Sequence, residues 1–488
     1  MLQNRGAFSA LRPFVMTDKR EGENRPDCKH ISQCATLPRM AVDGGRLPPQ
    51  PPRKEIATEF CALQHYVVSL QANDDRKIKT GTMTDSKIIN DPVFGFIKVP
   101  RGLLLDIVRH PLLQRLARIK QLGLTQEVYP GAQHTRFQHS LGAFHLMSEA
   151  LISLRQKGVF VFDSEAEAVQ AAILMHDIGH APFSHVLENT LISGITHEEI
   201  SLMMMDRINR EMHGALNLAI SIFKNEYPKS FLHQLISSQL DMDRLDYLRR
   251  DSFFTGVTEG NIGSARIIKM LNVVDDALVV ESNGIYSIEN FLTSRRLMYW
   301  QVYLHKTTVG CEHILINALR RAKQLARTGT ELFASPALRY FLYDDITARS
   351  FHTHTEALDN YIALDDNDIW SALKVWQQHD DRILARLSSN IVNRRLFKVE
   401  VREEEPTAGE MARLKEQISA RYGVSLADSS YLVGVDRVQK DMYNPFDDHI
   451  SILYKDGTLR DITEASEILN IELLSKKICK YYLCYQRF

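Results

Sequence analysis

Apolar residues recur every three or four positions through most of the chain between residues 103 and 330. This spacing places them on one face of an α-helix, so it predicts a series of amphipathic helices. A glycine follows the first of these helices, as is typical of a helix end. The predicted helices cover residues 103–123, 140–158, 165–180, 197–212, 214–225, 231–251 and 288–328.

The pattern changes to that of β-strands in two places. Residues 276–288 contain Asn283-Gly284, a pair typical of tight turns, and predict a short β-hairpin. Beyond about residue 393, short runs of β-branched and aromatic residues predict further strands. Helical character before that point predicts a helical continuation over residues 331–392. We therefore expect a mainly α protein with a small C-terminal α/β domain over residues 393–488.

Residues 1–82 have neither the helical nor the strand period and are rich in proline, glycine and arginine. This composition predicts a disordered leader or extension that the fold does not need. Met83 would then be a natural start, because the ordered pattern begins directly after it. Acidic residues in this stretch argue against an organellar targeting peptide.

Composition narrows the class of protein. The 488 residues carry a formal net charge of −1, so no global field attracts nucleic acid or a membrane surface, although a local basic cleft would not change this total. No apolar run approaches the ~20 residues that a membrane-spanning helix needs. The six cysteines form no CxxC pair, which favours a reducing cytoplasm over a disulfide framework. We expect a cytoplasmic protein without a membrane partner.

Polar residues interrupt the apolar pattern in three helical segments. They are His139 in "HTRFQHS", the pair His176 and Asp177 in "HDIGH", and Asp243 in "DMDRLD". Imidazole and carboxylate groups gathered in one place are typical metal ligands. His180 lies one helical turn beyond His176, so the predicted helix would put both on one face.

Each of these residues taken alone has an ordinary explanation. A single buried histidine usually makes a hydrogen bond in the core, and an Asp-Met-Asp-Arg run usually forms a solvated helix face. Chance is a poor explanation for all of them together, in order, within apolar helices. The sequence therefore predicts a metal site.

The ordered motifs resemble those of the HD-domain metal-dependent phosphohydrolases. The resemblance is closer to one branch, the deoxynucleoside triphosphate triphosphohydrolases, and covers roughly residues 91–330. It implies an HD-domain helical core over residues 83–330. The motifs that carry it are "DPVFGFIKV", "HPLLQRLARIKQLG", "HTRFQHS", "HDIGHAPFSH", "THEE", "DMDRLDYLRRD" and "YLHKTTVG".

The resemblance implies four metal ligands, namely His139, His176, Asp177 and Asp243. The family's ions are Mn²⁺, Mg²⁺, Fe²⁺ or Zn²⁺, and mixed nitrogen and oxygen ligation does not choose among them or between one ion and two. The resemblance also implies that His197 is a general acid or base, oriented by Glu188, with His180 beside the metal. The family usually has aspartate where this chain has Glu188. Thr196 and Glu199 also form a capping-box pattern, which would fix where His197 points.

The same resemblance implies the substrate contacts. Residues near the α-phosphate would be Arg136, His180 and His185, with Arg244 where the family commonly has lysine. Two aromatic residues, Tyr247 and Tyr303, would line the sugar, and Asp251 and Gln121 would contact the 3′-hydroxyl. Arg295 would hold the outer phosphates.

One departure from the family concerns regulation. The animal enzymes have an extra arginine for an activating nucleotide where this chain has Ala117, although Arg115 and Arg118 lie close by. A nucleotide effector is therefore an open question, as is nucleic-acid binding. Related enzymes are oligomers, so we expect a homo-oligomer, with the predicted helix 288–328 as a place for subunit contact.

The expected activity is metal-dependent hydrolysis of deoxynucleoside triphosphates to deoxynucleoside and triphosphate. One alternative is an HD-type phosphohydrolase acting on nucleoside monophosphates or on cyclic or alarmone nucleotides, although no Gly-Tyr-Pro motif follows "HDIGH". Another is a non-catalytic module that binds nucleotides or nucleic acid. A third alternative is a helical scaffold protein without a functional site. This alternative does not explain why the complete set of potential metal-ligand residues is present.

Overall fold

The computed structural model describes residues 86–183, 185–188, 190–440, 449–467 and 478–488, with the side chains of residues 185, 188 and 440 outside this description. The predicted leader over residues 1–82 and the proposed start at Met83 lie outside the described residues. All described residues belong to one compact unit that begins at Met83.

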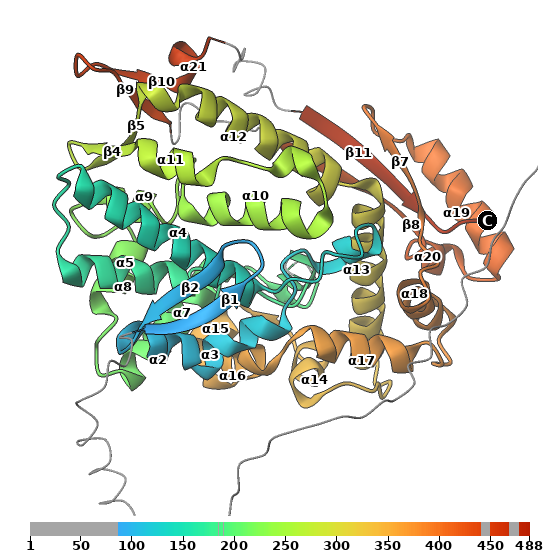
Figure 1. Ribbon diagram of the computed structural model, residues 1–488. Coiled ribbons are helices and arrows are strands. Elements are labelled where there is room, and N and C mark those ends of the chain that lie inside the picture. Colours follow the sequence, from blue (N-terminus) through green and yellow to red (C-terminus); the bar gives the residue numbers. More distant parts are fainter. Residues whose placement is uncertain (1–85, 184, 189, 441–448, 468–477) are drawn as a thin grey trace, which may run out of the picture. The chain divides into compact units, whose positions relative to one another are not determined.

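The fold is mainly helical, as the sequence predicted (Figure 1). Three helices form the centre of the core, where α4 packs between α5 and α10, and α2 and α8 pack against α5. Among the described residues no helix is both long enough and apolar enough to cross a bilayer. The helices of the first half are α2 (Leu103–Arg109), α3 (Pro111–Gln114), α4 (Arg136–Gln156), α5 (Asp163–Met175), α6 (His185–Glu188), α7 (His197–Glu211), α8 (Asn217–Phe223), α9 (Ser230–Gln234), α10 (Met242–Thr255) and α11 (Ser264–Met270).

Among the helices of the second half, α13 packs against the C-terminal strands β7 (Lys398–Arg402) and β11 (Ile478–Tyr485). Short 3₁₀ segments occur at Arg115–Arg118, Gly123–Glu127, Thr258–Gly260 and Ser282–Gly284, and a π-helical turn at Tyr299–Tyr303. The α-helices of the second half are α12 (Ile285–Met298), α13 (Lys306–Arg327), α14 (Pro336–Tyr343), α15 (Ala348–Thr353), α16 (Thr355–Ala363), α17 (Asp366–Trp376), α18 (Arg382–Val392), α19 (Ala408–Tyr422), α20 (Leu426–Ser429) and α21 (Ile462–Ala465).

Four predicted helices are shorter than the periodicity indicated. Helix 103–123 breaks at Pro111, because proline disfavours the helical conformation of the residue before it, and His110 is extended with ψ of 135°. Helix 231–251 is interrupted between α9 and α10, and helix 288–328 breaks at the π-helical turn between α12 and α13. Helix 165–180 already ends at Met175. The apolar periodicity continued through the breaks at residues 176–180 and 235–241, because buried apolar residues such as Ile178, Leu235 and Leu240 lie within them.

The predicted β-hairpin exists, but its predicted turn was wrong. Strand β4 (Leu271–Val274) pairs with β5 (Ala277–Glu281), with Val274 opposite Ala277. The turn is therefore Asp275-Asp276, and both residues have positive φ, at 51° and 59°. Aspartate tolerates this region and suits such a two-residue turn. Asn283 and Gly284 instead form the 3₁₀ segment that leads into α12.

The C-terminal segment contributes to two sheets. Strands β7 (Lys398–Arg402), β11 (Ile478–Tyr485) and β8 (Val433–Lys440) form an antiparallel sheet with β11 in the centre. Strands β9 (Ser451–Leu453) and β10 (Leu459–Asp461) instead extend the β4–β5 hairpin, where β9 runs parallel to β5. The sheet region at the C-terminus was predicted, whereas its return to the core was not. The boundaries at residues 330 and 392 stay a prediction.

Two small sheets complete the fold. The N-terminal hairpin pairs β1 (Ser86–Asp91) with β2 (Gly95–Pro100), and a short parallel pair joins β3 (Ile192–Ser193) to β6 (Ile346–Thr347). Strand β1 ends at Asp91, whose carboxylate accepts hydrogen bonds from the turn residues Val93 and Phe94. The same carboxylate also reaches into the core.

A buried charge network joins α4, α10 and β1. The carboxylate of Asp246 bonds the guanidinium of Arg250 through two N–H groups and His139 Nδ1 at 2.7 Å, while Arg250 also bonds Asp91 at 2.7 Å. Gly142 allows the two helices to meet here, because a Cβ at this position would lie 1.9 Å from Asp246 Oδ1 and 2.2 Å from Arg250 Nη2. The helices thus meet around charges that compensate one another, as burial demands.

We predict that Gly142→Ala lowers the free energy of unfolding by about 1–3 kcal/mol, because the added methyl group collides with rigid, buried atoms. Chemical denaturation measures this. Gly409→Ala is the matched control, because a Cβ there meets no atom within 4 Å. Equal stability of the two variants would contradict the close approach at Gly142.

Candidate metal centre and active site

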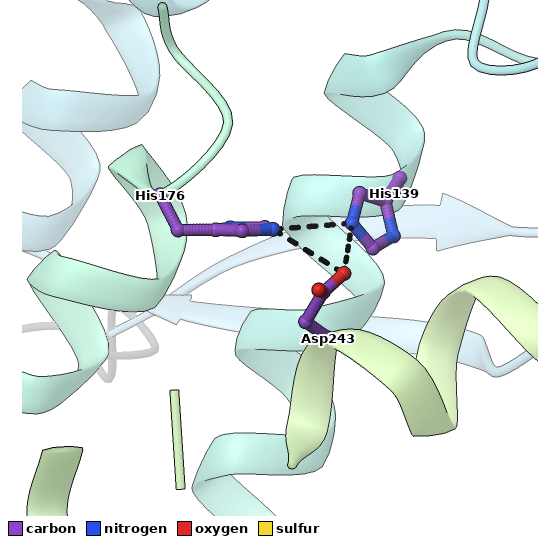
Figure 2. A group of neighbouring side chains, drawn as sticks. All are labelled: His139, His176 and Asp243. Carbon is purple, nitrogen blue, oxygen red and sulfur yellow. Dashed lines mark hydrogen bonds and ion pairs between the residues drawn. The ribbon is translucent and has the colours of Figure 1, made fainter. Parts of the chain in front are cut away.

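Three side chains from three elements converge at one end of the core (Figure 2). His139 is in the first turn of α4, which Thr135 and Gln138 fix with a capping box. His176 directly follows the last residue of α5, and Asp243 is in the first turn of α10, which Asp241 caps. Helix termini are well suited to this task, because capping fixes the orientation of their first residues.

His139, His176 and Asp243 form a cluster of potential metal ligands, the metal cluster. One potential ligand atom from each residue lies within 4.8 Å of the others. His139 Nε2 is 3.2 Å from His176 Nε2 and 3.0 Å from Asp243 Oδ1, and His176 Nε2 is 3.5 Å from the same oxygen. One ion about 2.0–2.2 Å from each atom would fit between atoms so spaced.

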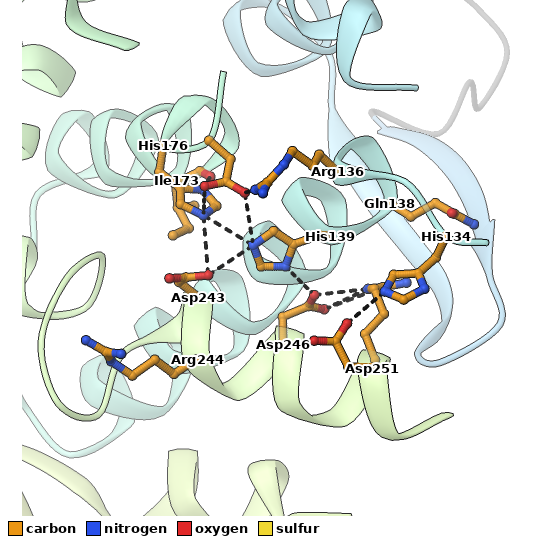
Figure 3. Close-up of polar contacts among 12 residues, drawn as sticks. His134, Arg136, Gln138, His139, Ile173, His176, Asp243, Arg244, Asp246 and Asp251 are labelled. Carbon is orange, nitrogen blue, oxygen red and sulfur yellow. Dashed lines mark hydrogen bonds and ion pairs between the residues drawn. The ribbon is translucent and has the colours of Figure 1, made fainter. Parts of the chain in front are cut away.

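The hydrogen bonds on the far side of each imidazole favour metal binding. His139 Nδ1 bonds the carboxylate of Asp246, and His176 Nδ1 bonds the backbone carbonyl of Ile173, both at 2.7 Å (Figure 3). Each Nδ1 therefore carries the proton, and each Nε2 can present a lone pair to an ion. The residues present thus fit a divalent metal ion.

Charge in the cluster also fits a cation. Burial lowers the pKa of His139, but hydrogen bonds to Asp243 and Asp246 outweigh burial and raise this pKa to about 10. Burial likewise opposes ionisation of Asp243, yet His139 and His176 hold its pKa far below the ordinary value. The site therefore stabilises positive charge among its ligands, and a divalent ion would supply that charge.

Asp177 borders the metal cluster but lies in a different set of contacts. Its Oδ2 bonds Arg136, its Oδ1 is 3.1 Å from His180 Nε2, and its oxygens are 3.4 Å from His176 Nε2 and 3.8 Å from His139 Nε2. Burial raises the pKa of Asp177, but His180, His176 and Arg136 outweigh it and keep the carboxylate ionised. Asp177 can approach an ion by exchanging one of these partners.

His176 and His180 do not share a helix face, contrary to the sequence-based expectation. The chain leaves the helix at His176 and forms a turn, in which the His180 amide bonds the Asp177 carbonyl at 3.1 Å. Arg115 holds this turn by donating to the backbone carbonyl of His180 at 2.9 Å. Burial and then Arg136 lower the pKa of His180 to about 3, so its imidazole is neutral.

His197 lies beside these residues as the first residue of α7. The capping box of Thr196 and Glu199, predicted from the sequence, is present. The ring of His197 stacks on that of His180, with centroids 4.0 Å apart and planes at 16°. The predicted partner Glu188, and His185, are in α6, and their side chains lie outside the described residues.

A cavity of about 350 Å³ opens beside the metal cluster. Its wall includes His197 together with Lys224 and His233, two basic residues that the sequence analysis did not select. They were missed because they are on short helical segments with no recognisable motif. His176, Asp177 and Asp243 line the same cavity, so its contents would meet both these potential ligands and the ammonium group of Lys224.

A second group of predicted substrate residues lies on the other side of His139. Tyr303 donates from its hydroxyl to Asp251 Oδ2 at 2.7 Å, and His134 Nε2 is 2.7 Å from Asp251 Oδ1. Tyr247 links this group to the metal cluster, because its ring centroid is 6.1 Å from that of Tyr303 and 6.5 Å from that of His139. None of these tyrosines or Asp251 lines the cavity described above.

The remaining predicted substrate residues are near this group or near the cavity. The backbone amide of Gln121 bonds the carbonyl of His134, and its side-chain oxygen is buried without a hydrogen-bond partner among the described residues. Arg295 donates to Gln239 at 2.8 Å, and Arg244 donates to the Ser238 carbonyl. Gln121 thus lies next to His134, whereas Arg244 bonds Ser238, the neighbour of the cavity residue Ser237.

Two residues that orient ligands were also missed. Asp246 lies three positions after Asp243, so the i, i+3 spacing in "DMDRLD" could have found it. His134 begins the motif "HTRFQHS", which also contains His139, and its ring stacks on Phe254 with centroids 4.5 Å apart. Both act through neighbours, which sequence spacing alone does not reveal.

The arginines next to Ala117 serve the fold. Arg115 is buried and donates to the carbonyls of Leu364 and His180. Arg118 forms an ion pair with Asp365. Both side chains therefore join the first helices to the N-terminus of α17.

Comparisons with known proteins identify two regions of the chain, the HD domain and a region associated with it. Residues 136–251 match the model of the HD domain, and residues 262–336 match that of the HD associated region. A crystal structure of a phosphohydrolase from Bacteroides thetaiotaomicron is 67% identical, with a TM-score of 0.81, over 82% of this chain and 100% of that chain.

Two curated relatives extend the comparison. The uncharacterized protein YwfO of Bacillus subtilis is 32% identical over 81% of this chain and 91% of its own length. The human deoxynucleoside triphosphate triphosphohydrolase SAMHD1 is 27% identical over 77% of this chain and 66% of its own length. The match thus spans just under two thirds of the human enzyme.

We predict that Asp246→Asn weakens metal binding by about 10–100-fold, because the substitution removes the charge that orients His139. Titration of the metal-free protein with Mn²⁺ measures this. Asp163→Asn is the control, since Asp163 is almost fully exposed. Unchanged affinity in a folded Asp246→Asn protein would show that the buried carboxylate does not support the ligand.

Proposed function

The chain belongs to the HD-domain phosphohydrolases, in the SAMHD1-like branch, and from this premise we propose that it hydrolyses deoxynucleoside triphosphates to deoxynucleoside and triphosphate. The observation that carries the proposal is the cavity beside the metal cluster, whose wall combines Asp177 and Asp243 with His197 and Lys224. Carboxylates there suit a divalent cation, and the basic residues suit the phosphates that accompany it.

The proposed reaction begins with attack of water on the α-phosphorus. The bond from this phosphorus to the 5′-oxygen breaks as the bond to the water oxygen forms, so the water oxygen becomes part of triphosphate. The 5′-oxygen leaves and takes a proton to give the deoxynucleoside. A divalent ion, when bound, would polarise a phosphoryl oxygen and lower the pKa of the water. We assign the metal ligands as His139, His176, Asp177 and Asp243.

His197 is the proposed general acid or base, because it lines the cavity next to Asp177 and Asp243. His233 lines the same cavity, but its Nδ1 bonds the backbone carbonyl of Ile222 at 3.1 Å. Its stacking on His180 fixes the ring, and its position at the N-terminus of α7 fixes the backbone. Glu188 is the proposed carboxylate that orients the imidazole and raises its pKa toward the working range. His180, kept neutral by burial and by Arg136, supports His197 without competing for the proton.

The sugar and phosphate contacts follow the same proposal. Tyr247 and Tyr303 would pack against the deoxyribose, where an apolar ring face disfavours a 2′-hydroxyl. Asp251 and Gln121 would form hydrogen bonds with the 3′-hydroxyl. The side-chain oxygen of Gln121 is buried and has no hydrogen-bond donor among the described residues, so it could accept one from this hydroxyl. Four basic residues, Arg136, His185, Arg244 and Arg295, would contact phosphate.

Assembly and regulation complete the proposal. We expect a homo-oligomer, as in the family. We do not assign the contact between subunits to the predicted helix 288–328, because this segment is divided into α12 and α13. Arg115 and Arg118 are the residues that could bind a nucleotide effector, but both already have partners. Arg115 bonds the carbonyls of Leu364 and His180, and Arg118 forms an ion pair with Asp365. An activating nucleotide would have to compete for these contacts. Cytoplasmic location stays a prediction, and nucleic-acid binding stays an open question.

Product analysis tests the proposed reaction. The metal-free protein is supplied with Mn²⁺ and incubated separately with deoxynucleoside triphosphates, nucleoside monophosphates and cyclic dinucleotides. We expect intact triphosphate and deoxynucleoside from the first group. Orthophosphate from monophosphates alone, or hydrolysis of only the cyclic compounds, would contradict the assignment in favour of another HD-type activity.

The assigned roles predict two different kinds of loss. Asp177→Ala and Asp243→Ala should each lower both metal content and activity, because each removes a metal ligand. His197→Ala should keep its metal while kcat falls by about 10²–10⁴-fold, as expected for loss of a general acid or base. His352→Ala is the control for a histidine exposed on the surface. Normal turnover in His197→Ala would refute its role.

A further inference from the structure

A second cluster of potential metal ligands lies outside the active site, where α13 meets the C-terminal sheet. It consists of His313 on α13, Asp436 on β8 and Cys484 on β11, and it shares no residue with the metal cluster. Helix α13 packs against β7 and β11 at this place (Figure 1). His313 and Cys484 are buried, and the Asp436 side chain is 37% exposed.

The sheet register brings the two strand residues to one face. Cys484 pairs with Gly434, and Asp436 follows Gly434 by two residues, so both side chains point to the same side of the sheet. Diagonal neighbours of this kind are within reach of each other in an antiparallel pair. The face they share is the one that receives the imidazole of His313.

Gly434 makes room for that imidazole. A Cβ at this position would lie 2.4 Å from Cε1 and 2.5 Å from Nε2 of His313. The ring therefore rests directly against the strand backbone, and no larger residue than glycine fits beneath it. This close approach fixes the ring between Asp436 and Cys484.

The imidazole and carboxylate of this cluster are as close to each other as those of the metal cluster. His313 Nδ1 is 2.9 Å from Asp436 Oδ2, compared with 3.0 Å between His139 Nε2 and Asp243 Oδ1. One ligand atom from each of the three residues lies within 4.8 Å of the others. His313 Nε2 is buried and has no hydrogen-bond partner among the described residues. A buried histidine with only a structural role would normally form a hydrogen bond through this nitrogen as well.

We propose that His313, Asp436 and Cys484 bind a zinc ion, with water as the fourth ligand on the exposed side of Asp436. Imidazole, carboxylate and thiolate are all zinc ligands, whereas a thiolate disfavours Mg²⁺ and Mn²⁺. One thiolate and one carboxylate neutralise a divalent ion, so the occupied site carries no net charge into a largely buried place. The catalytic ligands include no sulfur, which separates the ion preferences of the two sites.

Burial, Asp436 and Cys311 raise the pKa of the Cys484 thiol, so this residue is protonated without an ion. Zinc binding would form the Zn–S bond and release the thiol proton to solvent. The bound ion would join α13, which lies within the HD associated region, to the C-terminal sheet. Its role is therefore to stabilise this junction.

Cobalt provides a direct test, because Co²⁺ bound to a thiolate has a sulfur-to-metal charge-transfer absorption that N/O ligands do not produce. The full-length, metal-free protein is titrated with Co²⁺ and then with Zn²⁺. We expect this absorption in the unmodified protein and in Cys479→Ser, its removal by Zn²⁺, and its loss in Cys484→Ser. Cys479 is the matched control, since it is a free cysteine on the same strand.

Persistence of the absorption in Cys484→Ser, or its absence from the unmodified protein, would overturn the proposal. Replacement of Cys28, Cys34 and Cys61 by serine should leave the absorption unchanged, and its loss there would assign the thiolate elsewhere. If Cys484→Ser fails to fold, Asp436→Ala should weaken Co²⁺ binding by about tenfold or more, and equal affinity would reject the site. The optical signal is independent of hydrolysis, so it fails or succeeds separately from the proposed function.

Discussion

The buried contact between α4 and α10 is the constraint on which the active site depends. Asp246 and Arg250 form a charge pair with no exposed surface, and such a pair is stable only when its hydrogen bonds are complete. His139 and Asp91 complete them. The imidazole that satisfies Asp246 on one side therefore presents its other nitrogen to the metal cluster. Fold stability and ligand orientation are two results of one network, and Gly142 is the residue that permits it.

Around the rest of the site, too, contacts that stabilise the fold also position functional residues. The turn at His176–Gly179 is held from outside by Arg115, which bonds the His180 carbonyl, and by Tyr361, which bonds the Gly179 carbonyl at 2.6 Å. Helix capping positions His139, His197 and Asp243 at helix N-termini. Each functional side chain is thus placed by backbone features that have their own structural partners, which is how a polar site is kept rigid within an apolar core.

Much of this could be predicted from the sequence, and the failures have physical reasons. The helical class, the strands near the C-terminus and the grouping of His139, His176 and Asp243 followed from periodicity and from ordered motifs. The end of α5 at Met175 did not, because apolar burial continues into the turn through Ile178. The return of β9 to the β4–β5 hairpin could not be predicted either, since strand pairing between distant segments leaves no local signal. Lys224 and His233 escaped notice for the same reason, because only the tertiary fold brings them to the cavity.

The central claim is that this network prepares His139, His176 and Asp243 to hold one divalent ion beside the cavity. Anomalous X-ray diffraction from crystals soaked in Mn²⁺ tests it most directly, because the signal locates the ion without reference to activity. We predict a strong anomalous peak within coordination distance of His139 Nε2, His176 Nε2 and Asp243 Oδ1. A peak elsewhere with none among these three atoms, in crystals that diffract well, would contradict the account.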